Sequence, residues 1–379
     1  EDNNPVLYYK LQGQIAEEGY DLQKSDFFIV LQSQIQKNML TRFGHKGICC
    51  DSTHGTNAYD FTLTTILVMD EFDQGFPVGW CLSSHEDFIT MTIFIREIRK
   101  NCGVIQSKFF MSDMAPQFYN AWIAIMEGLR PAKLICTWHT DKAWQLELRR
   151  KIGSKQVQEE VYKMMRTALQ ETNEDVFEKL LLALLNYLGS KTIEFYEYFR
   201  KDWVLKKKEW AYCYRKGMGI NTNMYVEAFH RVFKRVYLKG KVNKRVDTCL
   251  VNLMQYVRDK AFNRMIKMTK GKLSYRINNI SKRHKQSLLM SPQNAVTVGD
   301  GVWSVSSDDN KHVYRVVLHA NCCPEDTKCK VRCKECNICI HQSQCTCPDS
   351  LITTTICKHI HLAKRLAEQK ENEHKKKVN

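Results

Sequence analysis

The sequence predicts a mixed α/β layer, followed by an all-helical segment and a small cysteine-rich module. Strand-type and helix-type patterns alternate between residues 47 and 138, and only helical patterns follow as far as about residue 289. Nine of the 16 cysteines then lie between residues 322 and 357. With 379 residues, 44% of them hydrophobic and 11% aromatic, the chain is long and apolar enough for two or three folded domains.

The α/β layer is predicted from the order of its apolar runs. Residues 1–45 are predicted to form a helical lead-in that ends at Gly44. Three β-branched and aromatic runs with short connections then predict an antiparallel meander, at residues 47–52, 61–70 and 75–84. Helical spacing and further strand-type runs alternate after it: a helix at 85–101, a strand at 108–113, a helix at 116–128 and a strand at 132–138. The resulting order, βββαβαβ, allows helices to cover both faces of one sheet.

The remaining elements are predicted to be mostly helical. Four helical patterns lie between residues 140 and 222, and one long basic helical region runs from Asn223 to about Leu289. Residues 302–318 have the pattern of a hairpin with its turn at Asp-Asp-Asn. Residues 358–369 are predicted to form a terminal helix, and 371–379 a frayed basic tail.

Positive charge is concentrated in one stretch of the chain. Residues 231–286, called the basic segment below, contain 17 Lys and Arg but only two acidic residues, whereas the remainder of the chain is almost balanced at 40 to 39. Such a concentration is typical of a surface that binds a polyanion, so we expect a nucleic-acid partner rather than a merely solvated helix face. The cations expected to contact phosphates are Arg231, Lys234, Arg235, Lys239, Lys241, Lys244 and Arg245.

The segregated cysteines indicate metal binding rather than disulfides. A secreted disulfide scaffold would be small and rich in cysteine throughout, whereas cysteines interleaved with histidines on a large basic chain favour zinc in a reducing compartment. We therefore expect the nucleus or cytosol, and no membrane partner, because no apolar run approaches about 18 residues. The first residues, EDNNPVLYY, have neither a signal segment nor an initiator Met, so we expect a further domain before them.

Two acidic residues follow predicted strands of the α/β layer. Asp51 ends the first strand of the meander and Asp113 ends the strand at 108–113. Functional residues gather at the carboxyl ends of strands in such layers, and two facing carboxylates favour a hard cation such as Mg²⁺ or Mn²⁺. A lone Asp at the end of a strand is, however, more often a cap or a turn former.

Four segments together resemble the catalytic core of Mutator-like element transposases. They are GHKGICCDSTHGTNAYDFTL, FFMSDMAPQFYNAW, LICTWH and NTNMYVEAFHRVFK, and the resemblance extends over about residues 25–240. It implies a ribonuclease H-like fold with a helical insertion, and a catalytic triad of Asp51, Asp113 and Glu227 that holds two Mg²⁺ ions. It also implies a C/D-x-x-H motif, here Cys136 and His139. We expect Cys136 to be small apolar packing and His139 a polar neighbour of the catalytic site.

A second resemblance concerns CTCPDSLITTTICKH, which has the CxC and CxH spacing of a SWIM zinc finger. Three thiolates and one imidazole would complete a closed tetrahedral zinc site. The ligands, called the SWIM cluster below, would be Cys345, Cys347, Cys357 and His359. Four nearby cysteines could form a second zinc site of their own or contribute to the first: Cys329, Cys333, Cys336 and Cys339.

These interpretations divide the chain into six parts. They are a lead-in (1–45), the first part of a ribonuclease H-like core (46–139), a helical insertion (140–222), the Glu helix with the basic region (223–290), a SWIM module (291–370) and a tail (371–379). The function expected from the resemblance is cleavage of double-stranded DNA at transposon ends and strand transfer into target DNA, by a homodimer or larger oligomer. The alternative is a domesticated, transposase-derived DNA-binding regulator without strand transfer. Three tryptophans could stack on bases or simply pack in the core: Trp144, Trp203 and Trp210.

Overall fold

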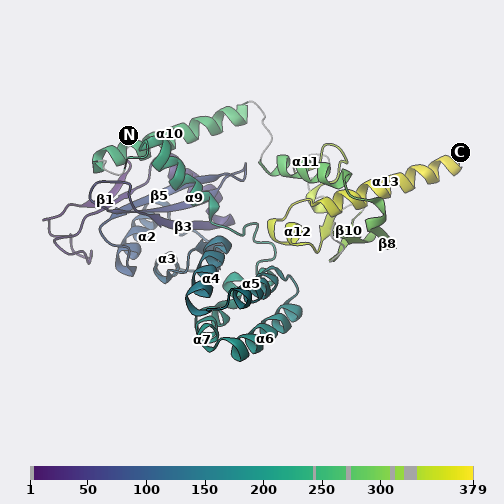
Figure 1. Cartoon of the computed structure of the whole chain (residues 1–379). Helices are drawn as coiled ribbons and strands as arrows, with labels where there is room; N and C mark the ends of the chain where they lie inside the picture. The colour runs from purple at the N-terminus through teal and green to yellow at the C-terminus, as the bar shows by residue number, and fades with distance from the viewer. Residues whose placement is uncertain (1–3, 242–244, 270–274, 308–311, 320–330, 379) are drawn as a thin grey trace. The chain divides into compact units, whose positions relative to one another are not determined.

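The computed structural model describes residues 4–241, 245–269, 275–307, 312–319 and 331–378. Its contacts divide the chain into two compact units (Figure 1). The first unit combines Glu1–Leu146 with Thr222–Lys272, and the second combines Glu147–Asn221 with Leu273–Asn379. Within the described residues, no helix is both long and apolar enough to cross a bilayer.

The first unit is built on a seven-stranded mixed sheet. Its strands follow the spatial order β1-β2-β5-β4-β3-β6-β7. Only β3, β6 and β7 run parallel to one another, and all other neighbours are antiparallel. The last five strands in this order form the βββαβαβ layer that the sequence predicts, with a ribonuclease H-like arrangement: β3 (Ile48–Thr53), β4 (Thr62–Met69), β5 (Gly75–Ser83), β6 (Phe109–Ser112) and β7 (Ala132–Ile135).

The predicted helical lead-in over residues 1–45 is wrong for most of its length. Two strands extend the sheet beyond β5, namely β1 (Val6–Lys10) and β2 (Phe28–Leu31). Only α1 (Gln34–Phe43) is helical, and it ends at Gly44 as predicted. The run that forms β2 is fully buried, and it pairs with β5 on one side and with β1 on the other. Periodicity cannot distinguish so short a buried strand from a helix.

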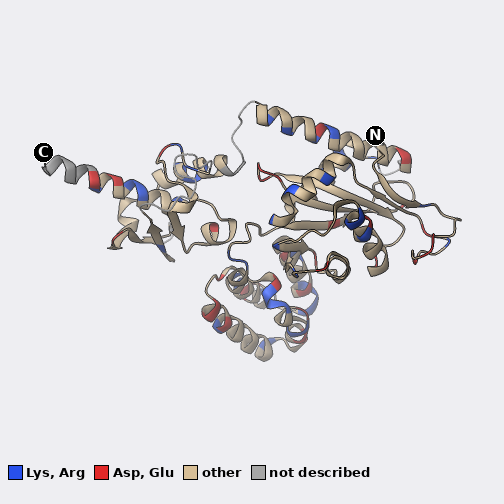
Figure 2. Ribbon diagram, turned by 180° about the vertical axis from the view of Figure 1, so that it is seen from behind, with Lys and Arg blue, Asp and Glu red and all other residues tan. Residues whose placement is uncertain are grey.

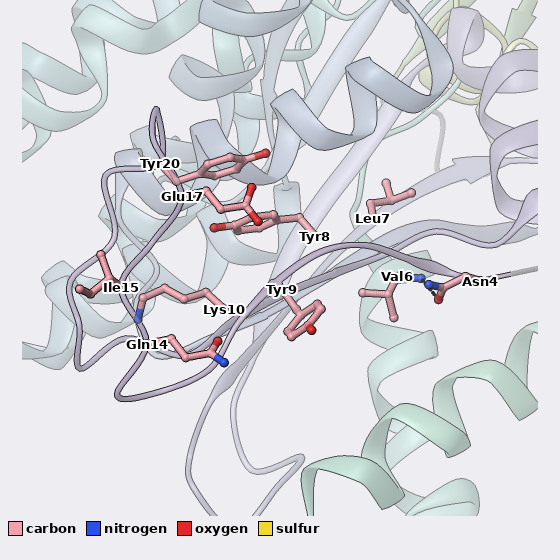
Figure 3. Close-up of a pocket in the computed structure, with 10 residues that line it drawn as sticks. All are labelled: Asn4, Val6, Leu7, Tyr8, Tyr9, Lys10, Gln14, Ile15, Glu17 and Tyr20. Carbon is pink, nitrogen blue, oxygen red and sulfur yellow. Dashed lines mark hydrogen bonds between the residues drawn. The ribbon is translucent and has the colours of Figure 1, made fainter. Parts of the chain in front are cut away.

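The loop after β1 folds back over that strand. The ring of Tyr20 stacks on the ring of Tyr8, with 4.0 Å between the ring centres, beside an open hollow that residues 4–20 line (Figure 3). The only acidic residue that lines this hollow is Glu17. It is therefore a feature of the sheet edge and holds none of the residues expected to carry out chemistry.

Helices cover both faces of the sheet. On β5, a side chain at Gly79 would collide with Ile98 of α2 (Phe88–Cys102), whereas the next residue, Trp80, contacts Phe229 of α9 (Met224–Val232). Because successive residues of a strand point to opposite faces, α2 and α9 lie on opposite sides of the sheet. Figure 1 also shows α2 and α3 (Pro116–Met126) on the side opposite α10. The sheet is consequently buried on both faces, as a layer of this class requires.

The expected single long helical region after Asn223 consists of several elements. A π-helical turn (Phe233–Tyr237) follows α9, and the chain then breaks at Lys239 and Gly240, both of which have positive φ. α10 (Val246–Thr269) and α11 (Tyr275–Leu288) come after this break. The break separates α10 from α9 because two successive left-handed residues cannot continue a right-handed helix.

The second unit contains the predicted helical segment, into which α4 (Thr137–Lys151) leads. It consists of α5 (Lys155–Gln170), α6 (Glu174–Lys191), α7 (Ile193–Asp202) and α8 (Lys207–Trp210). Trp203 and Trp210 are fully buried here, as Trp144 is in α4. Of the two roles considered for these three tryptophans, packing is confirmed and base stacking is excluded by their burial.

The C-terminal module of the second unit is a four-stranded antiparallel sheet covered by helices. Its strand order is β11-β10-β9-β8, from β8 (Ala295–Gly299), β9 (Val302–Ser306), β10 (Val313–Leu318) and β11 (Ser343–Cys345). The predicted hairpin is confirmed by the pairing of β9 with β10, and its turn lies outside the described residues. α12 (Pro348–Thr353) precedes α13 (Lys358–Val378), which continues through the residues expected to form a frayed tail.

Helix α11 belongs to the core of this module. Its Ile277 and Ile280 are buried together with Trp303 of β9 and Val316 of β10, and α11 packs against α13. The sequence placed this helix in the basic region at 223–290 because its surface is rich in Lys and Arg. Its buried face, which periodicity alone cannot assign to a partner, decides where it packs.

Candidate functional site

The two aspartates of the expected triad lie side by side at the end of the first unit's sheet. β3 and β6 run parallel, with Ile48 opposite Phe110 and Cys49 opposite Met111. The same register, continued by two residues, sets Asp51 level with Asp113. Asp113 follows the last residue of β6 and accepts a hydrogen bond from the backbone N–H of Ala115 at 3.0 Å. This bond turns the chain toward α3, so Asp113 is both a turn former and a neighbour of Asp51.

Glu227 reaches the same region because Asn223 anchors the start of α9. Asn223 is completely buried, and its side-chain amide donates to the carbonyl oxygen of Cys50 on β3 at 3.1 Å. Its backbone N–H donates to the Sγ of Cys136, also at 3.1 Å. α9 begins at the next residue, so Glu227 lies in its first turn. Asn223 thus ties the third acidic residue to the strand that holds the first one.

A fourth carboxylate, Glu86, lies in the same electrostatic environment. Burial and the negative charges of Asp113, Glu227 and Glu86 together raise the pKa of Asp51 to about 8, with burial the largest cause. Burial also raises the pKa of Glu86, which accepts hydrogen bonds from Ser52 and from Gln117, the latter at 3.2 Å. Sequence reasoning missed Glu86; its position three residues after the end of β5 and immediately before Asp87, the N-cap of α2, was the available signal.

These carboxylates could hold a divalent cation. Like charges gathered in a partly buried place destabilise one another unless a cation neutralises them, and oxygen ligands suit Mg²⁺ or Mn²⁺. Yet in the part of the chain that the structure describes, the carboxylate oxygens of Asp51, Asp113 and Glu227 do not all lie within 4.8 Å of one another. The ligand atoms of Glu227, Cys136 and His139 instead lie within this distance of one another.

Cys136 is more than apolar packing. It directly precedes α4, and besides the N–H of Asn223 its Sγ accepts backbone hydrogen bonds from Trp138 and His139. It therefore acts as a helix N-cap. An aspartate could accept the same bonds, which gives a physical reason for a C/D-x-x-H pattern.

His139 lies on the first turn of α4, facing Glu227. Its Nε2 is 3.8 Å from Oε1 of Glu227. Its buried Nδ1 has no hydrogen-bond partner within the described part of the chain. Burial lowers the pKa of His139, with Glu227 and Asp113 opposing that shift. A neutral imidazole in this position can accept or donate a proton beside the carboxylates.

An exposed aromatic residue adjoins His139. Trp138 is 45% exposed, its ring meets the His139 ring edge-on at 4.9 Å, and the ammonium of Lys142 lies 5.1 Å from the centre of the Trp138 ring. An exposed indole beside a lysine suits a nucleic-acid base next to its phosphate. Sequence reasoning did not select Trp138, because only its exposure distinguishes it from the buried tryptophans, and the fold decides that exposure.

The expected DNA-contacting cations differ in how free they are. Arg231, Arg235, Lys239 and Lys241 are exposed. Lys234 is partly buried, and desolvation lowers its pKa. Arg245 forms an ion pair with Asp247 at 3.0 Å, and Lys244 lies outside the described residues.

Other cations of the basic segment are engaged with the protein itself. Lys and Arg recur along α10, where they are blue in Figure 2. Arg264 of this helix pairs with Glu71, and Lys267 donates to Gln74 at 2.7 Å, so these two hold α10 against the turn between β4 and β5. His230 of α9 is buried, and its ring is hydrogen-bonded to the hydroxyl of Thr65 at 3.0 Å, so it is not an exposed cation.

The SWIM cluster is assembled in the second unit as its spacing predicts. All four residues are buried, and their ligand atoms lie within 4.8 Å of one another. Nδ1 of His359 lies 3.7 Å from the Sγ of Cys357 and 4.0 Å from that of Cys345. Ordinary zinc–sulfur and zinc–nitrogen bond lengths imply about 3.6 Å between two such ligands on a tetrahedron. The residues therefore fit a structural zinc ion.

The second expected set of four cysteines is wrong as a group. Cys333 and Cys336 are gathered with His284 and His361, whereas Cys329 lies outside the described residues. The thiol of Cys339 instead accepts the backbone N–H of Gln342 and caps a single 3₁₀ turn, Ile340–Gln342. Spacing could not reveal His284, which comes from α11, far earlier in the chain.

One family model matches part of the chain. It is described as "Zinc finger SWIM domain-containing protein 1/3, RNaseH-like domain" and matches residues 10–121. The match includes Asp51, Glu86 and Asp113 but ends before His139 and Glu227. No curated protein matches the chain. The chain thus has a ribonuclease H-like fold whose residues 10–121 are similar to that domain, together with a SWIM-like C-terminal module of buried Cys and His ligands.

Proposed function

We propose that this chain cleaves and joins DNA, as Mutator-like element transposases do, with a divalent cation held by Asp51, Asp113 and Glu227. The observation that carries the proposal is the parallel register that sets Asp51 level with Asp113 at the end of a sheet buried on both faces. A buried pair of like charges is costly to the fold, and a bound cation would offset that cost. The raised pKa of Asp51 supports this reading.

The chain's own residues would have distinct roles in this chemistry. When bound, Mg²⁺ would activate the attacking oxygen and stabilise the leaving one in a phosphoryl transfer. Asp51 and Asp113 would hold the cation from the sheet, and Glu227 from α9. His139 would exchange a proton with the water or 3′-hydroxyl that attacks. The exposed cations Arg231 and Arg235, one and two turns beyond Glu227, would bind the backbone phosphates of the DNA.

A cleavage assay tests the proposal. Purified chain is incubated with supercoiled plasmid DNA and either Mg²⁺ or Mn²⁺, and nicked product is measured alongside DNA binding by gel shift. Asp51→Asn, Asp113→Asn and Glu227→Gln should each abolish nicking and leave DNA binding within about twofold, since each removes a ligand charge at little steric cost. Glu127→Gln, at an exposed carboxylate paired with Arg99, is the control and should nick normally. Near-normal nicking by a triad variant would remove that residue from the catalytic role.

The second candidate is a DNA-binding regulator without strand transfer. The observation that favours it is the contact of Glu227 with His139 and Cys136 in place of the two aspartates. Mn²⁺ binding, followed by the paramagnetic resonance of the free ion, separates the two functions. Saturable binding that Asp51→Asn abolishes supports the enzyme; DNA binding with neither Mn²⁺ binding nor nicking supports the regulator.

A further inference from the structure

We propose that the C-terminal module holds a second structural zinc ion, with ligands from α11, a tight turn and the first turn of α13. The ligands, called the second cluster below, are His284, Cys333, Cys336 and His361. This inference goes beyond the proposed function and is independent of it, because every ligand lies in the second unit.

The second cluster has the composition and burial of a closed zinc site. All four side chains are buried, with at most 7% exposed, and their ligand atoms lie within 4.8 Å of one another. Sγ of Cys336 is 3.2 Å from Nδ1 of His361, and Sγ of Cys333 is 3.6 Å from Nδ1 of His284. A tetrahedral zinc would separate a sulfur and a nitrogen ligand by about 3.6 Å. Two thiolates with two imidazoles in this arrangement are typical of Zn²⁺.

The turn that carries the two cysteines has the shape such a site needs. The backbone N–H of Cys333 donates to the carbonyl of Ile338 at 2.9 Å, and Asn337 has a positive φ of 51°. This closes a tight loop that brings the thiols of Cys333 and Cys336 to one side. Cys339 follows this loop and is not among the described residues whose ligand atoms gather around Cys333 and Cys336.

The chain segment that holds the last two ligands of the SWIM cluster also holds His361, the fourth ligand of the second cluster. Cys357 directly precedes α13, and His359 and His361 lie on its first turn. Because the two residues are two positions apart on a helix, their side chains are separated by about 200° around its axis and point to opposite sides. His359 therefore faces the SWIM cluster, while His361 faces His284, with 5.1 Å between their ring centres. One five-residue segment, 357–361, would thus serve two metal ions.

The second zinc would make α11 part of the SWIM module. Arg283, adjacent to His284, binds Asp349 of α12 through two hydrogen bonds of 2.6 and 3.0 Å. Asp349 lies in the loop that the SWIM cluster closes. Because a ligand set of this kind forms only in the folded chain, zinc binding at the second cluster would contribute to the stability of the whole module.

Zinc content of the full-length chain, measured by plasma mass spectrometry, tests the inference. The wild-type chain should carry two zinc ions, and His284→Ala and Cys336→Ser should each carry one. Two matched controls, His312→Ala and Cys339→Ser, should retain both ions, because neither residue is a member of either cluster. A wild-type chain with one zinc, or His284→Ala with two, would overturn the assignment.

X-ray absorption of the wild-type chain keeps the test valid if a variant does not fold. If zinc occupies both the SWIM cluster and the second cluster, each zinc should have on average about 2.5 sulfur and about 1.5 nitrogen neighbours. The SWIM cluster alone would give about three sulfur and one nitrogen. A second site made of four cysteines would raise the average to about 3.5 sulfur. Either of the last two results would contradict the role of His284 and His361.

Discussion

The carboxylate of Asp51 lies level with that of Asp113 because β3 and β6 pair in parallel, with Cys49 opposite Met111. The two side chains arise from segments separated by a helix and two strands, and only the shared register makes them neighbours. Burial and the charge of Asp113 together keep the pKa of Asp51 near 8. In the absence of a cation, this relationship makes the stability of the core depend on pH.

We expect the chain, dialysed free of Mg²⁺ and Mn²⁺, to lose stability as the pH rises toward 8. Asp51 has an ordinary pKa of 3.8 and a folded-state pKa of about 8, so between these values the folded chain keeps a proton that the unfolded chain has released. The stabilisation is complete at low pH and is lost as the pH rises through the folded-state pKa. Urea denaturation from pH 5 to 8.5 should show a loss of about 2–4 kcal/mol in wild type relative to Asp51→Asn. Added Mg²⁺ should restore stability at pH 8.5 only in wild type; parallel pH profiles for the two proteins would contradict the argument.

Cys136 should stabilise the start of α4 by accepting hydrogen bonds and not by binding zinc. Cys136→Ala removes the acceptor for Asn223 and the first turn, so the free energy of unfolding should fall by about 1–2 kcal/mol. Cys136→Ser keeps an acceptor and should recover most of that loss. Both variants should contain as much zinc as wild type. Loss of one zinc in Cys136→Ala would instead show that Cys136, His139 and Glu227 hold a metal.

The exposed cations after Glu227 should account for much of the salt dependence of DNA binding. Each side chain that neutralises a phosphate contributes about 0.9 to the slope of log affinity against log salt. Replacing Arg231, Arg235 and Lys239 with Gln should therefore lower the slope by about two to three. A control that changes exposed lysines of the helical segment should leave it unaltered: Lys155, Lys163 and Lys179. Equal slopes for both triple variants would place the DNA elsewhere.

Trp138 should contribute to the binding of unpaired bases near the candidate site. It is 45% exposed and adjoins His139, which faces Glu227. Trp138→Ala should weaken binding of a single-stranded oligonucleotide by about 1–3 kcal/mol without changing the salt slope. Trp138→Phe, which keeps an aromatic face, should weaken it less. The melting temperature of both variants should stay close to that of wild type. An unchanged oligonucleotide affinity in Trp138→Ala would show that Trp138 does not bind bases.

The sequence by itself determined those parts of the protein whose residues lie close together in the chain. The strand patterns between residues 47 and 138 predicted the βββαβαβ layer, because a buried strand needs only a short apolar run with turns at its ends. The spacing of Cys345, Cys347, Cys357 and His359 predicted the SWIM cluster, because each pair of ligands comes from adjacent chain. These features are local, and local chemistry specifies them.

Tertiary structure decided whatever depends on which distant segments meet. The run at Phe28–Leu31 became a strand because β5 offered it an open edge. Glu86 joined the aspartates because the chain that leaves β5 brings its carboxylate within hydrogen-bonding reach of Ser52 on β3. His284 reached Cys333 because the apolar face of α11 packs against α13. Long-range pairing depends on the burial of whole faces and on the register between elements. No single segment of sequence contains both partners of such a contact, so only the folded chain could assign them.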